Sequence, residues 1–190
     1  MESKRKRGRP RKGQEALSAE RIMTEALRHV RVSDDPLSLR AIARSLRVDP
    51  MAIYTYFPTR EDLEIAVAVR VFSALYSPTS NEPDWRTQLQ RLIVDYANLL
   101  FEHPGILMAV LRLGTRADAP AKLFCDRFDT AIARLALPTD RRRIVRDFIV
   151  DYVHGAVASG VLSNHGTVTV AHIEDGLAWY LDSIAASTEW

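Results

Sequence analysis

Side chains suited to contact nucleic acid are concentrated in one short stretch, residues 38–63. Arg40 falls on one helical pattern, and Met51, Tyr54 and Thr55 fall on a second. Arginine can bond O6 and N7 of guanine together, a tyrosine hydroxyl can bond a phosphate, and methionine and threonine offer apolar contact to thymine methyls. These residue types at this spacing favour a surface that binds duplex DNA.

Two short helices joined by a tight break must position these side chains. Arg40 lies opposite the apolar stripe of the first helix, which comprises Leu39, Ile42, Ala43 and Leu46. Asp49 is a good N-cap for the second helix, and Pro50 suits its first position, where no N–H is needed. Pro58 is expected to end that helix, and Thr59 opens a capping-box pattern for the next one.

Helices this short are not stable alone in water, so they must pack on a third element. Ser18 is a suitable N-cap for a preceding helix with the apolar stripe Ile22, Ala26, Leu27 and Val30. The three helices together predict a helix-turn-helix, which places its second helix in the major groove and its first helix across the backbone.

The stretch from Leu37 to Leu63 resembles the DNA-binding signature of tetracycline-repressor (TetR) type regulators. Its run Ile-Tyr-x-Tyr-Phe-x-x-Arg-x-x-Leu matches the family's Leu-Tyr-x-His-Phe-x-x-Lys-x-x-Leu at nearly every marked position. Two departures stand out. Arg47 replaces a common glycine, so a less tight turn is expected; Tyr56 replaces the usual histidine, so this position keeps a hydroxyl for phosphate but does not titrate near neutral pH.

The resemblance also implies which residues touch DNA. Base contacts are expected from Arg40, Pro50, Met51 and Thr55. Phosphate contacts are expected from Tyr54, Tyr56, Arg60 and the helix N-terminus at Thr59. Packing of Tyr54 and Tyr56 against the small core is an open alternative, and Arg40 has the alternative of a solvated or merely phosphate-neutralising charge.

A basic arm precedes the three helices. Residues 1–12 carry seven Lys or Arg and one acid, a balance of +6 within a net charge of +2, so the remaining residues sum to −4. The segment Arg7-Gly8-Arg9-Pro10-Arg11 resembles the AT-hook core, which lies in the narrow minor groove of A·T-rich DNA. A solvated tail or a nuclear-import signal is the alternative, but beside a helix-turn-helix we favour a minor-groove arm made by Arg7, Arg9 and Arg11.

The second half of the chain shows long helical patterns and no strand signal, so we predict an all-α fold of about nine helices. Residues 77–83 form the clearest break. Beyond it, helices are expected at 85–102, 104–113, 120–137, 139–162 and 167–187. The predicted domains are the flexible arm 1–17, the helix-turn-helix domain 18–64, and an effector-binding and dimerisation domain 65–190.

The last two helices carry apolar residues on more than one face. One face meets the protein's own core, so a second must be covered, and a two-fold four-helix interface explains both. The predicted interface comprises Phe148, Tyr152, Gly155, Ser159, Leu177, Tyr180, Leu181 and Ile184. A larger monomer core is the alternative.

A small-molecule effector is also expected in the second half. Its apolar and aromatic residues could line a cavity, although most could equally be ordinary core. The candidate lining is Trp85, Phe101, Met108, Leu111, Arg112, Phe124, Phe128, Tyr152 and Trp179. The sequence does not identify the effector.

Composition argues against several other classes. A single cysteine cannot form an internal disulfide and fits a reducing cytoplasm. The longest apolar run, residues 106–111, is far too short to span a membrane. No zinc-protease spacing, Gly-x-Ser-x-Gly, phosphate loop or dinucleotide fingerprint occurs, so no enzyme, cofactor or metal is predicted.

Asp151 and His154 share a helix face, where a structural hydrogen bond is favoured over an acid–base or metal pair. A nucleoid-type protein without an effector is a further alternative. The sequence thus predicts a cytoplasmic homodimer that binds a palindromic operator and is released by an unidentified small molecule.

Overall fold

The computed structural model describes residues 16–79, 84–162 and 168–187, so the basic arm predicted at residues 1–12 lies outside the described residues. The described residues are all helical, without strands, which confirms the predicted fold class. The helices are α1 (Ala19–Val32), α2 (Leu39–Leu46), α3 (Pro50–Tyr54), α4 (Arg60–Ser73), α5 (Trp85–Glu102), α6 (Pro104–Leu113), α7 (Asp118–Ala131), α8 (Thr139–Leu162) and α9 (Val170–Ser187). Two 3₁₀ turns, Gly114–Ala117 and Ala133–Leu135, flank α7.

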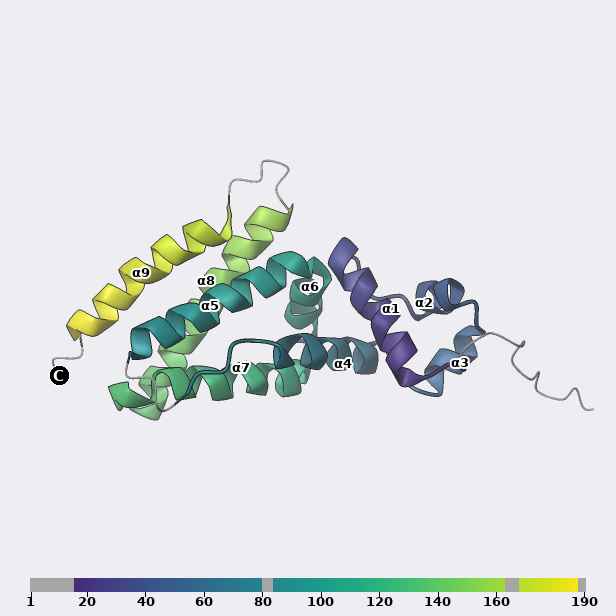
Figure 1. Ribbon diagram of the computed structural model, residues 1–190, viewed down its shortest axis with the longest axis horizontal. Helices are drawn as coiled ribbons and strands as arrows, with labels where there is room; N and C mark the ends of the chain where they lie inside the picture. Colours follow the sequence, from purple (N-terminus) through teal and green to yellow (C-terminus); the bar gives the residue numbers. More distant parts are fainter. Residues whose placement is uncertain (1–15, 80–83, 163–167, 188–190) are drawn as a thin grey trace, which may run out of the picture.

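The molecule is elongated, with a small head of α1–α3 at one end and a larger body of α5–α9 at the other (Figure 1). Helix α4 connects the two parts and packs against α1, α6 and α7. The head encloses its own apolar residues, including Ile22, Ala26, Ile42 and Ile53. These residues continue into one core shared by both parts, and α4 and α6 both contact α1.

The caps predicted for the head at Ser18 and Asp49 are confirmed. Ser18 accepts the Arg21 N–H at 3.2 Å, and Asp49 accepts the Met51 N–H at 2.8 Å. Ser38, which we did not predict as a cap, accepts the Ala41 N–H at 3.2 Å at the start of α2. Helix α3 is shorter than expected, because it ends at Tyr54 rather than running up to Pro58. Its few residues are therefore held by the cap and by burial of Ile53 rather than by helix length.

The turn between α2 and α3 is tight, contrary to our expectation. Arg47 adopts the left-handed conformation with φ 56° and ψ 45°, the region in which a glycine would be unstrained. The Val48 N–H then bonds the Ala43 carbonyl at 2.9 Å, which closes the end of α2. Arg47 is exposed and holds this conformation at a cost of about 1–3 kcal/mol, in a turn closed by backbone hydrogen bonds.

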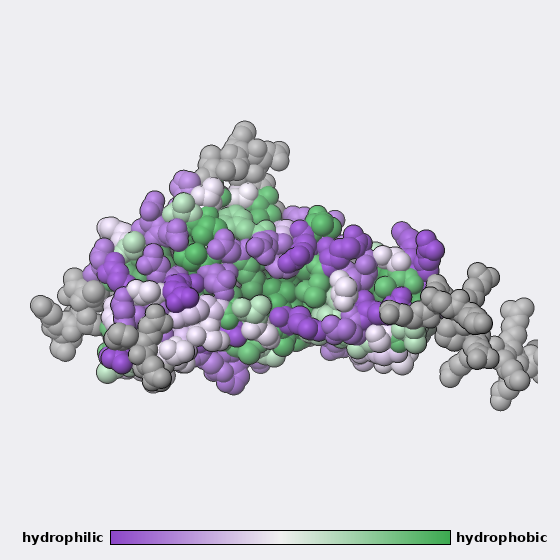
Figure 2. All heavy atoms as spheres, viewed as in Figure 1, coloured by the Kyte–Doolittle hydropathy of each residue, from purple (hydrophilic) through white to green (hydrophobic). Residues whose placement is uncertain are grey.

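Head and body meet most closely at the start of α6. A Cβ placed on Gly105 would lie 2.7 Å from the Ser33 carbonyl oxygen and 3.0 Å from the Val30 Cα, so only glycine lets α6 approach the end of α1. Figure 2 shows hydrophobic side chains reaching the surface near this junction, in the middle of the view. No helix among the described residues is long and apolar enough to cross a membrane.

Candidate nucleic-acid interface

Helix α3 buries its inner face, which leaves the opposite face exposed to solvent. Ile53 is fully buried and Phe57 nearly so, which turns Met51, Tyr54 and Thr55 toward solvent; Met51 is 69% exposed. Residues three and four apart lie on one side of a helix, so these three share a face. Pro50 at the first position is exposed too.

Arg40 extends this exposed face onto α2. It is exposed near the N-terminus of the helix, opposite the buried Leu39 and Ile42, and α2 packs directly against α3. A guanidinium in this position is free to reach a base edge or a phosphate. The structure thus brings Arg40, Pro50, Met51, Tyr54 and Thr55 to two adjoining helices with their side chains outward.

Tyr56 differs from the other candidates because its hydroxyl already has a partner. It donates a 2.7 Å hydrogen bond to the carbonyl of Leu17. The proton offered to a phosphate in our prediction is therefore used inside the head, although the ring is still partly exposed. The bond ties the end of α3 to Leu17, just ahead of α1.

The N-terminus of α4 is also occupied. Thr59 and Asp62 form the predicted capping box: the Thr59 N–H donates to Oδ2 of Asp62 at 3.0 Å, and the Asp62 N–H donates to the Thr59 hydroxyl at 3.0 Å. The Thr59 N–H is therefore unavailable to a phosphate. Arg60 is partly exposed, with its guanidinium 3.5 Å from the buried carboxylate of Glu64.

Glu64 is a residue that sequence reasoning missed. Its carboxylate is fully buried and bonds Arg112 of α6 at 2.5 Å, so Arg112, predicted to face an effector, instead links the body to α4. A buried carboxylate is stable only when paired. Because 48 residues separate the partners, no local pattern could have revealed the pair.

The surface of α8 and α9 exposes several large apolar side chains. Phe148 is 52% exposed and Trp179 74% exposed, and Ile144 and Tyr152 also reach solvent. The Phe148 and Tyr180 rings stack with centroids 4.4 Å apart, which joins the two helices into one face. Gly155 adds a flat position, because a Cβ there would meet nothing within 4 Å.

Two predicted interface residues lie elsewhere. Leu177 and Leu181 are fully buried with Ile173 where α9 packs on α5, so this stripe belongs to the protein's own core. Trp179, which we expected in a ligand cavity, is instead on the outer face of α9. The side of α9 that carries Trp179 also carries Gly176 and Ser183, whereas Ile173, Leu177 and Leu181 form the apolar stripe that packs inward. Gly155 and Ser159 are exposed as expected, and the Ile184 side chain lies outside the described residues.

The titratable side chains Tyr96, His154 and Cys125 have structural positions in the body. The Tyr96 hydroxyl and His154 Nε2 are 2.6 Å apart, and burial lowers the pKa of His154 and raises the pKa of Tyr96. His154 thus pairs with Tyr96 rather than with Asp151. Burial likewise raises the pKa of the Cys125 thiol. Among the described residues, no group of three or more His, Cys, Asp or Glu is arranged to hold a metal ion.

We compared the chain with known proteins to identify its fold. No protein-family model matches the sequence, and no curated protein matches it. Solved structures do: a TetR variant from Acinetobacter baumannii AYE in complex with minocycline has 22% identity and a TM-score of 0.71 over 92% of this chain and 97% of that one. Mycobacterium smegmatis BioQ has 18% identity and a TM-score of 0.75, over 90% and 99%. BioQ with its double-stranded DNA operator has 18% identity and a TM-score of 0.66, over 86% and 99%.

The chain has the TetR fold.

Within the TetR fold, the nine predicted pocket residues do not gather around one cavity. Phe124 is buried against Tyr96 and Phe128 against Phe124 in the core, Trp179 and Leu111 are exposed, and Arg112 is bonded to Glu64. Trp85, Phe101 and Met108 are half-buried, and Tyr152 donates to the His172 carbonyl at 3.1 Å. A cleft that the described residues form lies elsewhere, between head and body, and none of the nine lines it.

Proposed function

We propose that this protein is a homodimeric, sequence-specific DNA-binding regulator of transcription, a repressor that a small molecule releases from a palindromic operator. The observation that carries the proposal is the helix-turn-helix head with its outward Arg40, Met51 and Tyr54, on a chain with the TetR fold. Its residues resemble the family signature at Ile53, Tyr54 and Phe57, and depart from it at Arg47 and Tyr56. The operator in the BioQ structure and the minocycline in the TetR structure are consistent with such a role.

The proposed dimer forms through α8 and α9. Trp179 on α9 is 74% exposed, and Phe148 and Ile144 on α8 are 52% and 55% exposed, so both helices leave large apolar side chains in water, which marks a candidate interaction surface. Pairing the two helices with their symmetry mates would bury this surface in a four-helix interface. A dimer is also what two half-sites, about 34–36 Å apart on DNA, require.

On DNA, α3 would enter the major groove with Pro50, Met51 and Thr55 at base edges. Arg40 would read a guanine, and Tyr54 and Arg60 would hold phosphates. Met51 and Thr55 cannot form the bidentate pairs that give strong discrimination, so we assign part of the selectivity to the arm. Arg7, Arg9 and Arg11 would lie in an adjoining A·T-rich minor groove.

The proposal assigns no catalytic step and no cofactor to the chain, and it places the protein in the cytoplasm, with the DNA it controls. Its test is selection of bound duplexes from a random library by the purified full-length protein, followed by measurement of mass and affinity in solution. A dimer that enriches a palindromic sequence is the expected result. A protein that stays monomeric and prefers no duplex over heparin would refute the proposal.

A further inference from the structure

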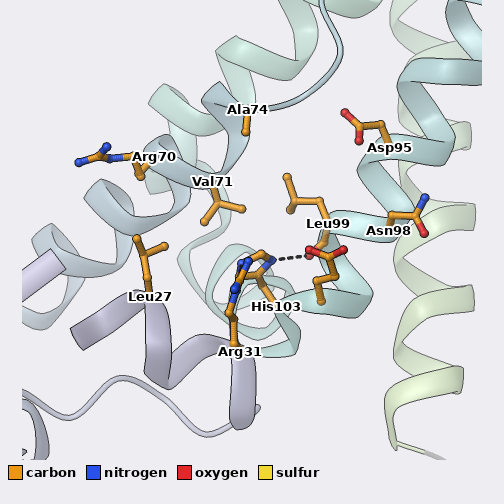
Figure 3. A pocket seen from close by; sticks show the side chains of 10 residues that line it. Leu27, Arg31, Arg70, Val71, Ala74, Asp95, Asn98, Leu99 and His103 are labelled. Atoms are coloured by element: carbon orange, nitrogen blue, oxygen red, sulfur yellow. Dashed lines mark hydrogen bonds between the residues drawn. The ribbon is translucent and has the colours of Figure 1, made fainter. Parts of the chain in front are cut away.

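A cleft of about 280 Å³ lies at the junction of head and body. Its walls come from α1, α4 and α5, so both parts of the molecule and the helix between them border it (Figure 3). The side chains of Leu27, Val71, Ala74 and Leu99 form its apolar part. A ligand here would contact head and body at once.

The head contributes one oriented cation. Nε of Arg31 donates to Nε2 of His103 at 3.0 Å, and Nδ1 of His103 lies 2.9 Å from the Leu99 carbonyl. A carbonyl only accepts, so Nδ1 of His103 donates to Leu99 while Nε2 accepts from Arg31. The terminal nitrogens of Arg31 have no bonding partner among the described residues. They form a pre-oriented fork for an acidic group.

The body contributes an acidic edge. Asp95, Asn98 and Glu102 follow one another at helical spacing along the same side of α5 and border the cleft. Asp95 accepts the Tyr76 N–H at 2.6 Å through Oδ2 only. Asn98 and Glu102 are exposed and make no side-chain hydrogen bond to any described residue.

The remaining cation at the cleft, Arg70, is already paired with a carboxylate. Arg70 points away from the apolar part (Figure 3), and its guanidinium bonds both carboxylate oxygens of Glu20 at 2.6 and 2.7 Å. The uncompensated charges are therefore Arg31 on one side and Asp95 with Glu102 on the other. Two carboxylates disfavour a simple anion, and Arg31 disfavours a simple cation.

We propose that this cleft binds a small zwitterion with an apolar side chain, of which a free apolar amino acid is the simplest example. The carboxylate would bond Arg31, the ammonium group would contact the edge formed by Asp95 and Glu102, and the side chain would cover Leu27 and Leu99. The volume lies below the roughly 300–1,000 Å³ of sites for drug-sized ligands, which favours a molecule of this size.

If the protein is the regulator proposed above, this ligand is an effector. It bridges α1 and α5, so it binds best at one angle between head and body and shifts the protein toward that angle. Gly105 lies at the same junction, where α6 meets α1 without a side chain between them. Occupancy of the cleft would then change how far apart the two heads of a dimer lie.

The test is isothermal titration of the full-length protein, without DNA, with L-leucine and L-phenylalanine. Two analogues of leucine separate its charges: 4-methylpentanoate lacks the amine and 3-methylbutylamine lacks the carboxylate. We expect at least one amino acid to bind. For leucine, each analogue should bind about tenfold or more weakly, because each lacks one charge-assisted hydrogen bond.

Substitutions at the cleft test whether the amino acid binds there. Glu102→Gln and Arg31→Gln should each raise the Kd about tenfold, whereas Asp126→Asn, an exposed carboxylate on α7, should leave it unchanged. Arg31→Gln also removes the bond to His103 and can loosen the head. Glu102→Gln breaks no hydrogen bond to a described residue, so an unchanged Tm shows that its effect comes from the ligand.

Absence of amino-acid binding, equal binding of the charge-deleted analogues, or an unchanged Kd in Glu102→Gln would each overturn the proposal. Operator affinity, measured separately with the selected duplex, distinguishes a failure of the ligand-site proposal from a failure of the regulator proposal. Selective DNA binding without amino-acid binding rejects the cleft and leaves the regulator standing. Amino-acid binding with the expected variant pattern, but without DNA binding, supports the ligand site and rejects the regulator.

Discussion

Two surfaces of the molecule expose large apolar side chains, and they differ in extent and in neighbours. The α3 surface is a single five-residue helix carrying Met51 and Tyr54, with Arg40 on the adjoining helix. The face of α8 and α9 comes from helices of 24 and 18 residues and displays Phe148 and Trp179. The small surface with cations nearby suits a polyanion, whereas the broad face suits another apolar surface.

A charge introduced on the apolar face of α8 and α9 should have the largest effect. Trp179→Glu should abolish the dimer, because two carboxylates would be buried at the interface without partners. Operator affinity should then fall about a hundredfold or more, since each head binds its half-site alone. Analytical ultracentrifugation and DNA titration measure the two effects. Leu111→Glu, at a residue of α6 that is 52% exposed, is the control and should leave the dimer intact.

Removing residues 1–12 tests whether the DNA surface extends beyond α3. Affinity at physiological salt should fall by at least about tenfold, and the slope of log affinity against log salt should flatten by about 0.9 for each phosphate that the arm no longer neutralises. The dimer should persist. Fluorescence anisotropy over a salt series measures both quantities, and an unchanged slope would show that the arm does not touch DNA.

Arg40→Ala should cost about 1–3 kcal/mol of operator binding and relax the base preference at one position of each half-site. Arg44→Ala, an exposed arginine on the same helix, is the matched control and should weaken all sequences evenly or not at all. A binding series over single-base variants of the operator separates the two. Equal, uniform losses in both variants would reduce Arg40 to a phosphate contact.

Tyr56→Phe should have the smallest effect. It removes the hydrogen bond to the Leu17 carbonyl, so the free energy of unfolding should fall by about 0.5–1.5 kcal/mol while the salt slope of DNA binding stays unchanged. Denaturant unfolding and the same salt series provide the measurements. If stability held and operator affinity fell, the hydroxyl would be a phosphate contact after all.

Local signals predicted much of the fold. The bounds of α5, α6 and α8 agree with the predicted 85–102, 104–113 and 139–162. Pro104 marks one of these boundaries, and Ser18, Asp49 and Thr59 mark the starts of others as caps, because a helix terminus is decided by groups within a few residues of it. Prediction was less accurate where packing overrides propensity. Arg47 takes the conformation of a glycine, and α7 ends at Ala131 in a 3₁₀ turn.

The sequence by itself determined the short helices of the head, the caps at Ser18 and Asp49 and the outward position of Arg40 and Met51, since all of these depend on neighbours within one or two turns. Only the tertiary structure decided that Leu177 and Leu181 belong to the protein's own core, because an apolar stripe suits the core of one chain and an interface with a second copy equally well. It alone also brought Arg112 to Glu64 and Arg31 to His103, across 48 and 72 residues. Contacts over such separations follow from how helices pack, which no local pattern encodes.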